Sequence, residues 1–372
     1  MPLSSEKRNP ALDVVRCFAF SSVVFIHFFM YAGFYDEIIT GWLFWLMIIL
    51  RTLLLPCVPL FLLLSGYLMI EKKLTRTYYR KLIDTLAVYV LASLCCLLSN
   101  VIHSQIAGDN DSPLGYLLIG IFSYTTAPYA WYIEMYIGLF LLIPFLNILY
   151  ANLRSRREKL GLVATLFVVC ALPAAVNIFR FDSLQWWLNP TENSYYHNLL
   201  PAFWRFSYPV FYYYVGAYLR EYTLKLKKLP CGVLIVLWAV LFGSFQFYRS
   251  YGSIFVQGEW QGWSSAYVAA GSILVFHLLS GLDCSQWSEK AKKTAGYLSG
   301  LCLGGYLVSA IFDKWFYEIL NNSLDTFFDK IFYIPLIVPA VIICSLILSA
   351  ILNWVYRFLK IRICSVLQIL RV

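Results

Sequence analysis

Long apolar runs alternate with short polar segments along almost the whole chain. A helix that crosses a lipid bilayer needs about 20 mostly apolar residues. Ten runs come close to this length or exceed it, at 11–33, 42–70, 82–103, 131–150, 160–180, 203–220, 231–249, 263–282, 296–312 and 333–356. The pattern predicts an all-α integral membrane protein with about ten transmembrane helices.

Two of these runs contain residues that shape helices and their packing. Pro56 and Pro59 remove backbone donors from the second run, so we expect a kink there. Gly300 and Gly304 form a G-x-x-x-G pattern in the ninth run. This spacing lets another helix approach closely, and it predicts a tight helix contact.

Composition agrees with the run pattern and excludes other classes. The 372 residues are 60% hydrophobic and only 13% charged, and the mean hydropathy is +0.69. A disordered chain or an ordinary soluble domain would carry far more charge. The ten cysteines lie nearly all in apolar runs without a C-x-x-C pair, which predicts buried thiols and no metal site. We expect a single membrane domain over residues 1–372.

The positive charge follows the predicted topology. Most of the 29 Lys and Arg residues lie in every second polar segment. Because short basic segments stay in the cytoplasm, this alternation predicts that both termini are cytoplasmic. The net charge of +9 does not indicate nucleic-acid binding, since the basic residues form no continuous stripe. The basic segments are 7–8, 72–81, 154–159, 220–228, 290–293 and 357–371.

The segments predicted outside are rich in aromatic and hydrogen-bonding side chains. Residues 183–197 read SLQWWLNPTENSYYH, and residues 258–267 read GEWQGWSSAY. Such side chains suit sugar rings, and Trp186, Trp187 and Tyr195 are candidate contacts for a glycan. The alternative is an interfacial aromatic belt, which composition alone favours.

The first run contains ionisable residues that lipid would not tolerate. Asp13, Arg16 and His27 share one face of the expected helix, and Arg16 and His27 lie about 16 Å apart along its axis. Such groups need protein or water around them. Asp13 and Arg16 are spaced to pair, which also fits a simple cytoplasmic anchor. His27 is either a structural core residue or a general base, since its ordinary pKa lies near neutrality.

Two further ionisable residues enter predicted spans. Arg51 lies in the second run at a depth near that of His27, and it needs an anion or carbonyl partner because it cannot lose its charge. Glu134 follows Trp131 at the outer end of the fourth run. Glu134 is placed to orient His27, to pair with Arg51 or to lie at the interface, and the sequence leaves these three open.

These residues lie in segments that resemble the membrane-bound acyltransferase 3 family. ALDVVRCFAFSSVVFIHFF at 11–29 resembles the family's first helix, with Asp13, Arg16 and His27 at its D-x-x-R and R-x(10)-H positions. Further similar helices follow, with the family's basic inner loop matched at 72–86, and together these segments cover most of the chain. They are RTLLLPCVPLFLLLSGYLM at 51–69, KKLTRTYYRKLIDTL at 72–86, AWYIEMYIGLFLLIP at 130–144 and YLSGLCLGGYLVSAIF at 297–312. Ser309 departs from the family, many members of which have a histidine there.

The resemblance implies transfer of an acyl group, commonly acetyl, from cytoplasmic acyl-coenzyme A to an extracytoplasmic or lipid-linked glycan. The expected location is the inner (cytoplasmic) membrane of a bacterium, with multiple spans in the lipid bilayer. We expect no metal cofactor and no nucleic-acid partner.

Residue chemistry is compatible with this reaction. His27 is the predicted general base, Arg51 the oxyanion stabiliser and Glu134 the group that fixes the imidazole; an acyl-histidine relay is a variant. The alternative from another class is a transporter or exporter of a polar or lipid-linked substrate. Predicted donor-binding residues are Asp13, Arg16, Arg76, Arg80 and Lys81, and predicted acceptor-binding residues are Trp131, Trp186, Trp187 and Tyr195.

Overall fold

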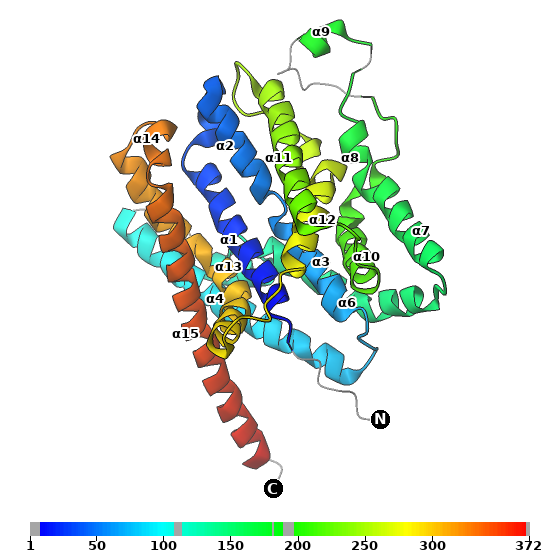
Figure 1. The fold of residues 1–372 in the computed structure, drawn as a ribbon. Coiled ribbons are helices and arrows are strands. Elements are labelled where there is room, and N and C mark those ends of the chain that lie inside the picture. The colour runs from blue at the N-terminus through cyan, green and yellow to red at the C-terminus, as the bar shows by residue number, and fades with distance from the viewer. Residues whose placement is uncertain (1–7, 108–113, 181, 189–196, 370–372) are drawn as a thin grey trace. The chain divides into compact units, whose positions relative to one another are not determined.

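A computed structural model describes residues 8–107, 114–180, 182–188 and 197–369. Every regular element within these ranges is a helix, in agreement with the all-α prediction (Figure 1). The elements are α1 (Pro10–Tyr31), η1 (Phe34–Asp36), α2 (Gly41–Leu54), α3 (Cys57–Met69), α4 (Arg76–Ala107), α5 (Leu114–Phe122), α6 (Trp131–Asn152), α7 (Arg156–Leu166), η2 (Phe167–Ala171), α8 (Pro173–Val176), α9 (Leu184–Leu188), η3 (Phe203–Ser207), α10 (Tyr208–Glu221), α11 (Lys228–Ser250), η4 (Glu259–Gln261), α12 (Ala266–Ser280), α13 (Glu289–Ser323), α14 (Phe327–Ile331) and α15 (Ile334–Ile369).

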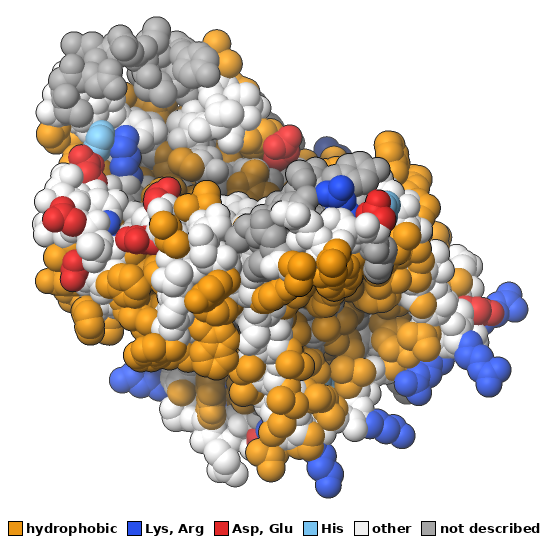
Figure 2. Space-filling view, turned by 90° about the horizontal axis from the view of Figure 1, so that it is seen from above, with side chains coloured by type: hydrophobic (Ala, Val, Ile, Leu, Met, Phe, Trp, Pro, Cys, Tyr) orange, Lys and Arg blue, Asp and Glu red, His pale blue; other side chains and the backbone are white. Residues whose placement is uncertain are grey.

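Eight helical segments in the described part of the chain are long and apolar enough to span a membrane. They match eight of the ten predicted spans. Hydrophobic side chains are exposed over much of the surface seen in Figure 2, as a lipid-facing protein requires. The segments are Pro10–Tyr31, Gly41–Met69, Arg76–Ile106, Trp131–Asn152, Lys228–Ser250, Glu259–Ser280, Glu289–Ser323 and Ile334–Ile361.

The two remaining predicted spans form shorter or interrupted helices. The run at 160–180 is divided among α7, the π-helical turn η2 and α8, which begins at Pro173. The run at 203–220 forms the 3-10 turn η3 and the 14-residue helix α10. The count of about ten spans therefore stays a prediction, as does the cytoplasmic location of the termini.

Local chemistry explains where the first helices begin and break. The Asn9 side chain accepts a hydrogen bond from the Ala11 amide and caps α1, with Pro10 in the first turn. The predicted kink is confirmed, because α2 ends at Leu54 and α3 begins at Cys57, directly after Pro56.

Contacts divide the chain into two compact units. Unit 1 comprises residues 1–71 and 149–299, and unit 2 comprises residues 72–148 and 300–372. Unit 1 contains a core cluster of Leu55, Ile178, Phe242, Trp260 and Val268.

Helices α3 and α10 of unit 1 pack through two glycines. A Cβ atom at Gly66 would overlap the backbone carbonyl of Tyr213, and a Cβ atom at Gly216 would overlap that of Leu63. Backbone cannot rotate away as a side chain can, so each position requires glycine. This is the close approach that small residues permit between membrane helices.

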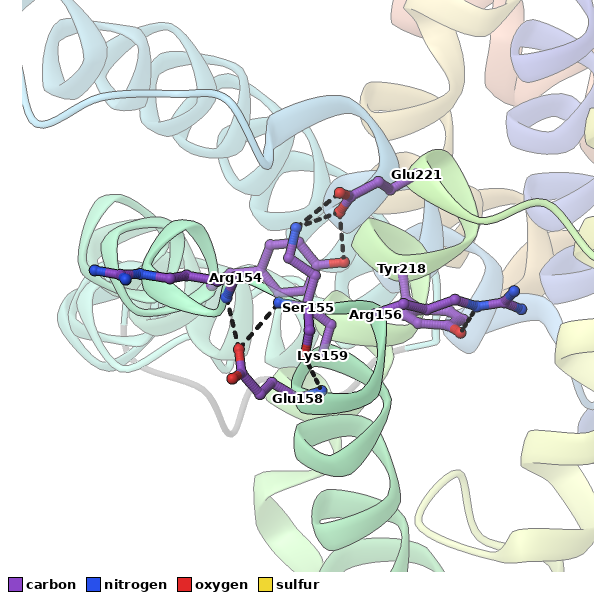
Figure 3. Close-up of polar contacts among 8 residues, drawn as sticks. Arg154, Ser155, Arg156, Glu158, Lys159, Tyr218 and Glu221 are labelled. Atoms are coloured by element: carbon purple, nitrogen blue, oxygen red, sulfur yellow. Dashed lines mark hydrogen bonds and ion pairs between the residues drawn. The ribbon is translucent and has the colours of Figure 1, made fainter.

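An ion-pair cluster joins the ends of α6, α7 and α10 in unit 1 (Figure 3). The Lys159 ammonium donates to both Glu221 carboxylate oxygens, at 2.7 and 2.8 Å, and the Tyr150 hydroxyl donates to the same carboxylate at 3.2 Å. Arg156 donates to the Tyr218 hydroxyl at 3.1 Å. Partial burial raises the pKa of Glu221. The hydrogen bonds, led by that from Lys159, lower it by more than burial raises it, so the pKa lies below its usual value.

The start of α7 is fixed by a capping box, also visible in Figure 3. The Ser155 hydroxyl accepts from the Glu158 amide, and the Glu158 carboxylate accepts from the amides of Ser155 and Arg154. These backbone donors hold the pKa of Glu158 below its usual value.

In unit 1, polar contacts join residues that lie at or near segments with the same predicted side of the membrane. At or beside the basic segments, these contacts are Arg8–Gly296, Glu71–Arg220 and Lys159–Glu221. Near the predicted outer side, they are Ile39–Ser253, Trp187–Tyr248 and Arg205–Glu259.

Unit 2 contains α4, α5, α14 and α15 with most of α6 and α13. A Cβ atom at Gly304 would overlap the Ser349 hydroxyl of α15, which confirms the close helix contact expected there, whereas the corresponding position at Gly300 is open. Asp313 is fully buried and accepts a 2.6 Å hydrogen bond from the Tyr129 hydroxyl.

Candidate functional site

The cytoplasmic end predicted for α1 carries a network of charged side chains in unit 1. The carboxylate of Asp13 is buried and accepts two hydrogen bonds from Arg8, at 2.7 and 2.8 Å. The predicted pairing of Asp13 with Arg16 is looser, with a closest N–O distance of 4.0 Å. Arg8 is thus the principal partner of Asp13. The hydrogen bond to the Asp13 carboxylate holds the pKa of the Arg8 guanidinium above its usual value.

Arg16 reaches from α1 to α13. Its Nη1 atom donates a 2.7 Å hydrogen bond to the hydroxyl of Ser299, which is itself buried. Arg8 also contacts this helix through a 2.8 Å bond to the Gly296 carbonyl. Sequence reasoning missed Ser299, because a serine 283 residues away carries no signal of this contact. In the sequence, Arg8 indicates only which side of the membrane the N-terminus lies on.

His27 lies farther along α1, with only 6% of its surface exposed. Its ring contacts the Tyr31 ring edge to face, with centroids 6.3 Å apart. Phe28 and Phe29 beside it are fully buried, and α1 packs on α2, α3 and α12 of the same unit. The imidazole is therefore enclosed by protein rather than presented to lipid, as a functional ionisable group in a span requires.

Arg51 is 7% exposed and is held by neutral side chains. Its Nε donates to the Tyr35 hydroxyl at 2.9 Å, and its Nη1 donates to the Gln246 side-chain oxygen at 3.2 Å. Its guanidinium lies over the Phe255 ring, 4.7 Å from the centroid. Gln246 is fixed in turn, since its amide donates to the Thr52 hydroxyl at 2.9 Å.

This arrangement keeps a full positive charge in a desolvated position. Neutral partners satisfy donors of Arg51 without cancelling its charge, and such a group is suited to stabilise a developing anion. Tyr35 and Gln246 were missed from the sequence, because neutral residues in apolar runs resemble any other core position.

The other predicted reactive and donor-binding residues belong to unit 2 and are exposed. Glu134 lies in the first turn of α6, and Arg76, Arg80 and Lys81 lie in the first turns of α4. Trp131 begins α6 and is half-buried. The roles proposed for these residues stay predictions.

The predicted acceptor residues of unit 1 differ in accessibility. Trp186 is 2% exposed, and its ring lies 4.4 Å from the guanidinium carbon of the fully buried Arg249. Trp187 is 43% exposed and stacks on Phe179 with centroids 5.9 Å apart. Of the two, Trp187 presents a ring surface to a ligand. Tyr195 lies outside the described residues.

Ser309, where many family members have a histidine, is fully buried in α13. Its hydroxyl donates to the Tyr306 carbonyl of the preceding turn at 2.9 Å. Within the described ranges, no group of three or more His, Cys, Asp or Glu side chains is arranged to hold a metal ion.

Comparison with known proteins agrees with the resemblance. A family model described as an acyltransferase domain matches residues 9–354, nearly the whole chain. The chain belongs to the acyltransferase 3 family. The matched range of this acyltransferase domain includes every predicted site residue, from Asp13 to Tyr195. No curated protein and no solved structure gives a significant match. Family membership and the apolar helices together indicate a multi-pass membrane acyltransferase.

Proposed function

We propose that this protein transfers an acyl group, acetyl in the simplest case, from cytoplasmic acyl-coenzyme A to a hydroxyl of an extracytoplasmic or lipid-linked glycan. The observation that carries the proposal is the enclosed imidazole of His27 on the same membrane helix as Arg16 and Asp13, in a chain of the acyltransferase 3 family. The proposed location is a bacterial cytoplasmic membrane.

The length of α1 suits the shape of the donor. Arg16 and His27 are separated by about 16 Å along the helix axis, which is on the order of the length of the pantetheine arm. A donor whose phosphates stay near Arg16 would therefore present its thioester at the level of His27.

The proposed reaction is a direct acyl transfer. His27 accepts the proton of the acceptor hydroxyl as that oxygen attacks the thioester carbonyl. The carbon–sulfur bond then breaks, and the leaving thiolate takes the proton back from the imidazolium. Arg51 stabilises the negative charge on the carbonyl oxygen in between. Glu134 is proposed to fix the imidazole tautomer.

The proposed orientation places the basic segments and both termini in the cytoplasm. Two observations support it. The basic segments alternate along the chain, and in unit 1 residues at or beside the basic segments contact one another, as do residues near the predicted outer side. In this orientation the predicted acceptor contacts serve the outer side of the membrane, and the predicted donor contacts serve the cytoplasmic side. The acceptor contacts are Trp131, Trp186, Trp187 and Tyr195, and the donor contacts are Arg76, Arg80 and Lys81.

The direct test is mass spectrometry of membrane glycans after incubation with labelled acetyl-coenzyme A, with and without the protein. The proposal expects labelled glycan that carries the mass of one acetyl group only when the protein is present. Movement of unmodified glycan across the membrane, without label, would instead establish the transporter alternative.

A further inference from the structure

The first turns of α13 border a shallow, open hollow that no residue assigned to the reaction above lines. It has a volume of about 480 Å³ and is lined by Lys290, Lys293, Thr294 and Tyr297. All four side chains are exposed, and 58% of the Tyr297 surface is accessible. Two ammonium groups, a hydroxyl and an aromatic ring therefore border one accessible space in unit 1.

This segment of α13 is joined to the charged end of α1. Arg8 donates to the carbonyl of Gly296, which lies between Thr294 and Tyr297 in the sequence. Arg16 donates to Ser299 on the following turn. The negative charge of Asp13 is paired mainly with Arg8. Asp13 therefore does not balance the positive charges of Arg16 and of the two lysines.

We propose that the hollow between Lys290, Lys293, Thr294 and Tyr297 binds the nucleotide end of the acyl-coenzyme A donor. The two ammonium groups bind its phosphates, and the Tyr297 ring stacks on the adenine. Ammonium–phosphate contacts are charge-assisted, and bases stack readily on exposed aromatic rings. The inference rests on the proposed function and adds a donor subsite to it.

The position of the hollow suits a donor that reaches His27. Ser299 lies six positions after Lys293, which is about 9 Å along α13. Ser299 contacts Arg16, where the proposed path along α1 toward His27 begins. A nucleotide in the hollow would thus lie at the start of this path.

The same helix turn offers a matched control. Lys292 lies between the two lining lysines, but its ammonium pairs with Glu289 at 3.1 Å. The substitution Lys292→Gln removes the same charge from the same helix turn without removing a side chain that lines the hollow. A general electrostatic effect would make Lys292→Gln resemble Lys290→Gln.

The experiment measures acyl transfer and binding of adenosine 3′,5′-bisphosphate, which has the nucleotide end without the pantetheine arm. The inference expects the double variant Lys290→Gln/Lys293→Gln to raise KM for acyl-coenzyme A and to weaken bisphosphate binding, each by about tenfold, with kcat nearly unchanged. Lys292→Gln should change both by less than about twofold. Tyr297→Leu should weaken bisphosphate binding but leave competition by inorganic pyrophosphate unchanged.

Three results would overturn the inference. The first is unchanged KM and bisphosphate affinity in the double variant of an active enzyme, and the second is an equal loss in Lys292→Gln. The third is unchanged donor KM together with weaker stabilisation of the detergent-solubilised double variant by anionic lipid, which would assign the lysines to headgroups. Failure of the proposed function is distinguishable, since wild-type protein would then transfer no acyl group even if the bisphosphate bound as expected.

Discussion

The candidate site residues of the two units differ in how deeply they are buried. In unit 1, Asp13, His27 and Arg51 are each less than 10% exposed, and named partners hold Asp13 and Arg51 in place. In unit 2, Arg80 and Glu134 are exposed. A buried charge acts through fixed geometry in a low dielectric, whereas an exposed charge acts through a screened field. We therefore expect the buried residues His27 and Arg51 of unit 1 to affect mainly kcat, and the exposed basic residues of unit 2 to affect mainly KM.

A large effect, exceeded only by that of His27→Ala, is expected from Arg51→Ala. Loss of one oxyanion-stabilising group should lower kcat by about 10²- to 10³-fold, because this interaction exists chiefly in the transition state. KM should change little. Steady-state kinetics on purified protein gives both parameters, and a variant with normal kcat and raised KM would move Arg51 to the binding sites.

Helix packing offers a second contrast between the units. Gly66→Ala should destabilise the protein by about 1–3 kcal/mol, because the new methyl group meets the Tyr213 backbone. Gly304→Ala in unit 2 should cost less, since the Ser349 hydroxyl that it meets can rotate. Thermal unfolding in detergent measures the difference. Gly232→Ala, with open space around the new methyl group, serves as the control. Equal losses of stability at all three glycines would show that close backbone contact is not what Gly66 provides.

A smaller effect is expected from Gln246→Ala, which leaves Arg51 present but less well oriented. We expect kcat to fall by about tenfold, with KM nearly constant, because a positioning hydrogen bond to a charged group is lost. Ser244→Ala on the same helix removes a hydrogen bond from Trp45 and should leave kcat unchanged. A normal kcat in folded Gln246→Ala, or an equal loss in Ser244→Ala, would contradict the positioning role.

The smallest effect is expected in unit 2. Arg80→Ala should raise KM for acyl-coenzyme A by about threefold, and its effect should diminish at high salt because the side chain is exposed. Kinetics at two ionic strengths measures this dependence. A large, salt-independent loss of kcat would show that the contrast between the units does not hold.

Much of the fold could be predicted, because hydrophobic runs and proline positions report directly on membrane helices. Eight predicted spans and the break at Pro56 have counterparts in the structure. Hydropathy failed to show that the run at 160–180 is interrupted by a π-helical turn, because such turns depend on backbone packing rather than composition.

The candidate site was predictable only where charge interrupts an apolar pattern. His27 and Arg51 were predicted in this way, and both are buried in the structure. Their supporting residues were not found. Gln246 lies 195 residues from Arg51 along the chain, and its partnership arises only when α11 packs on α2.

The most direct test of the account is the rate of acyl transfer by His27→Ala beside His277→Ala in membrane vesicles. His277 is a suitable control because its ring is engaged with the Leu226 carbonyl at 2.9 Å, in the same unit. The account predicts that His27→Ala lowers the rate by about 10²- to 10⁴-fold while bisphosphate binding and thermal unfolding stay normal, and that His277→Ala remains active. Normal product formation by folded His27→Ala would contradict it.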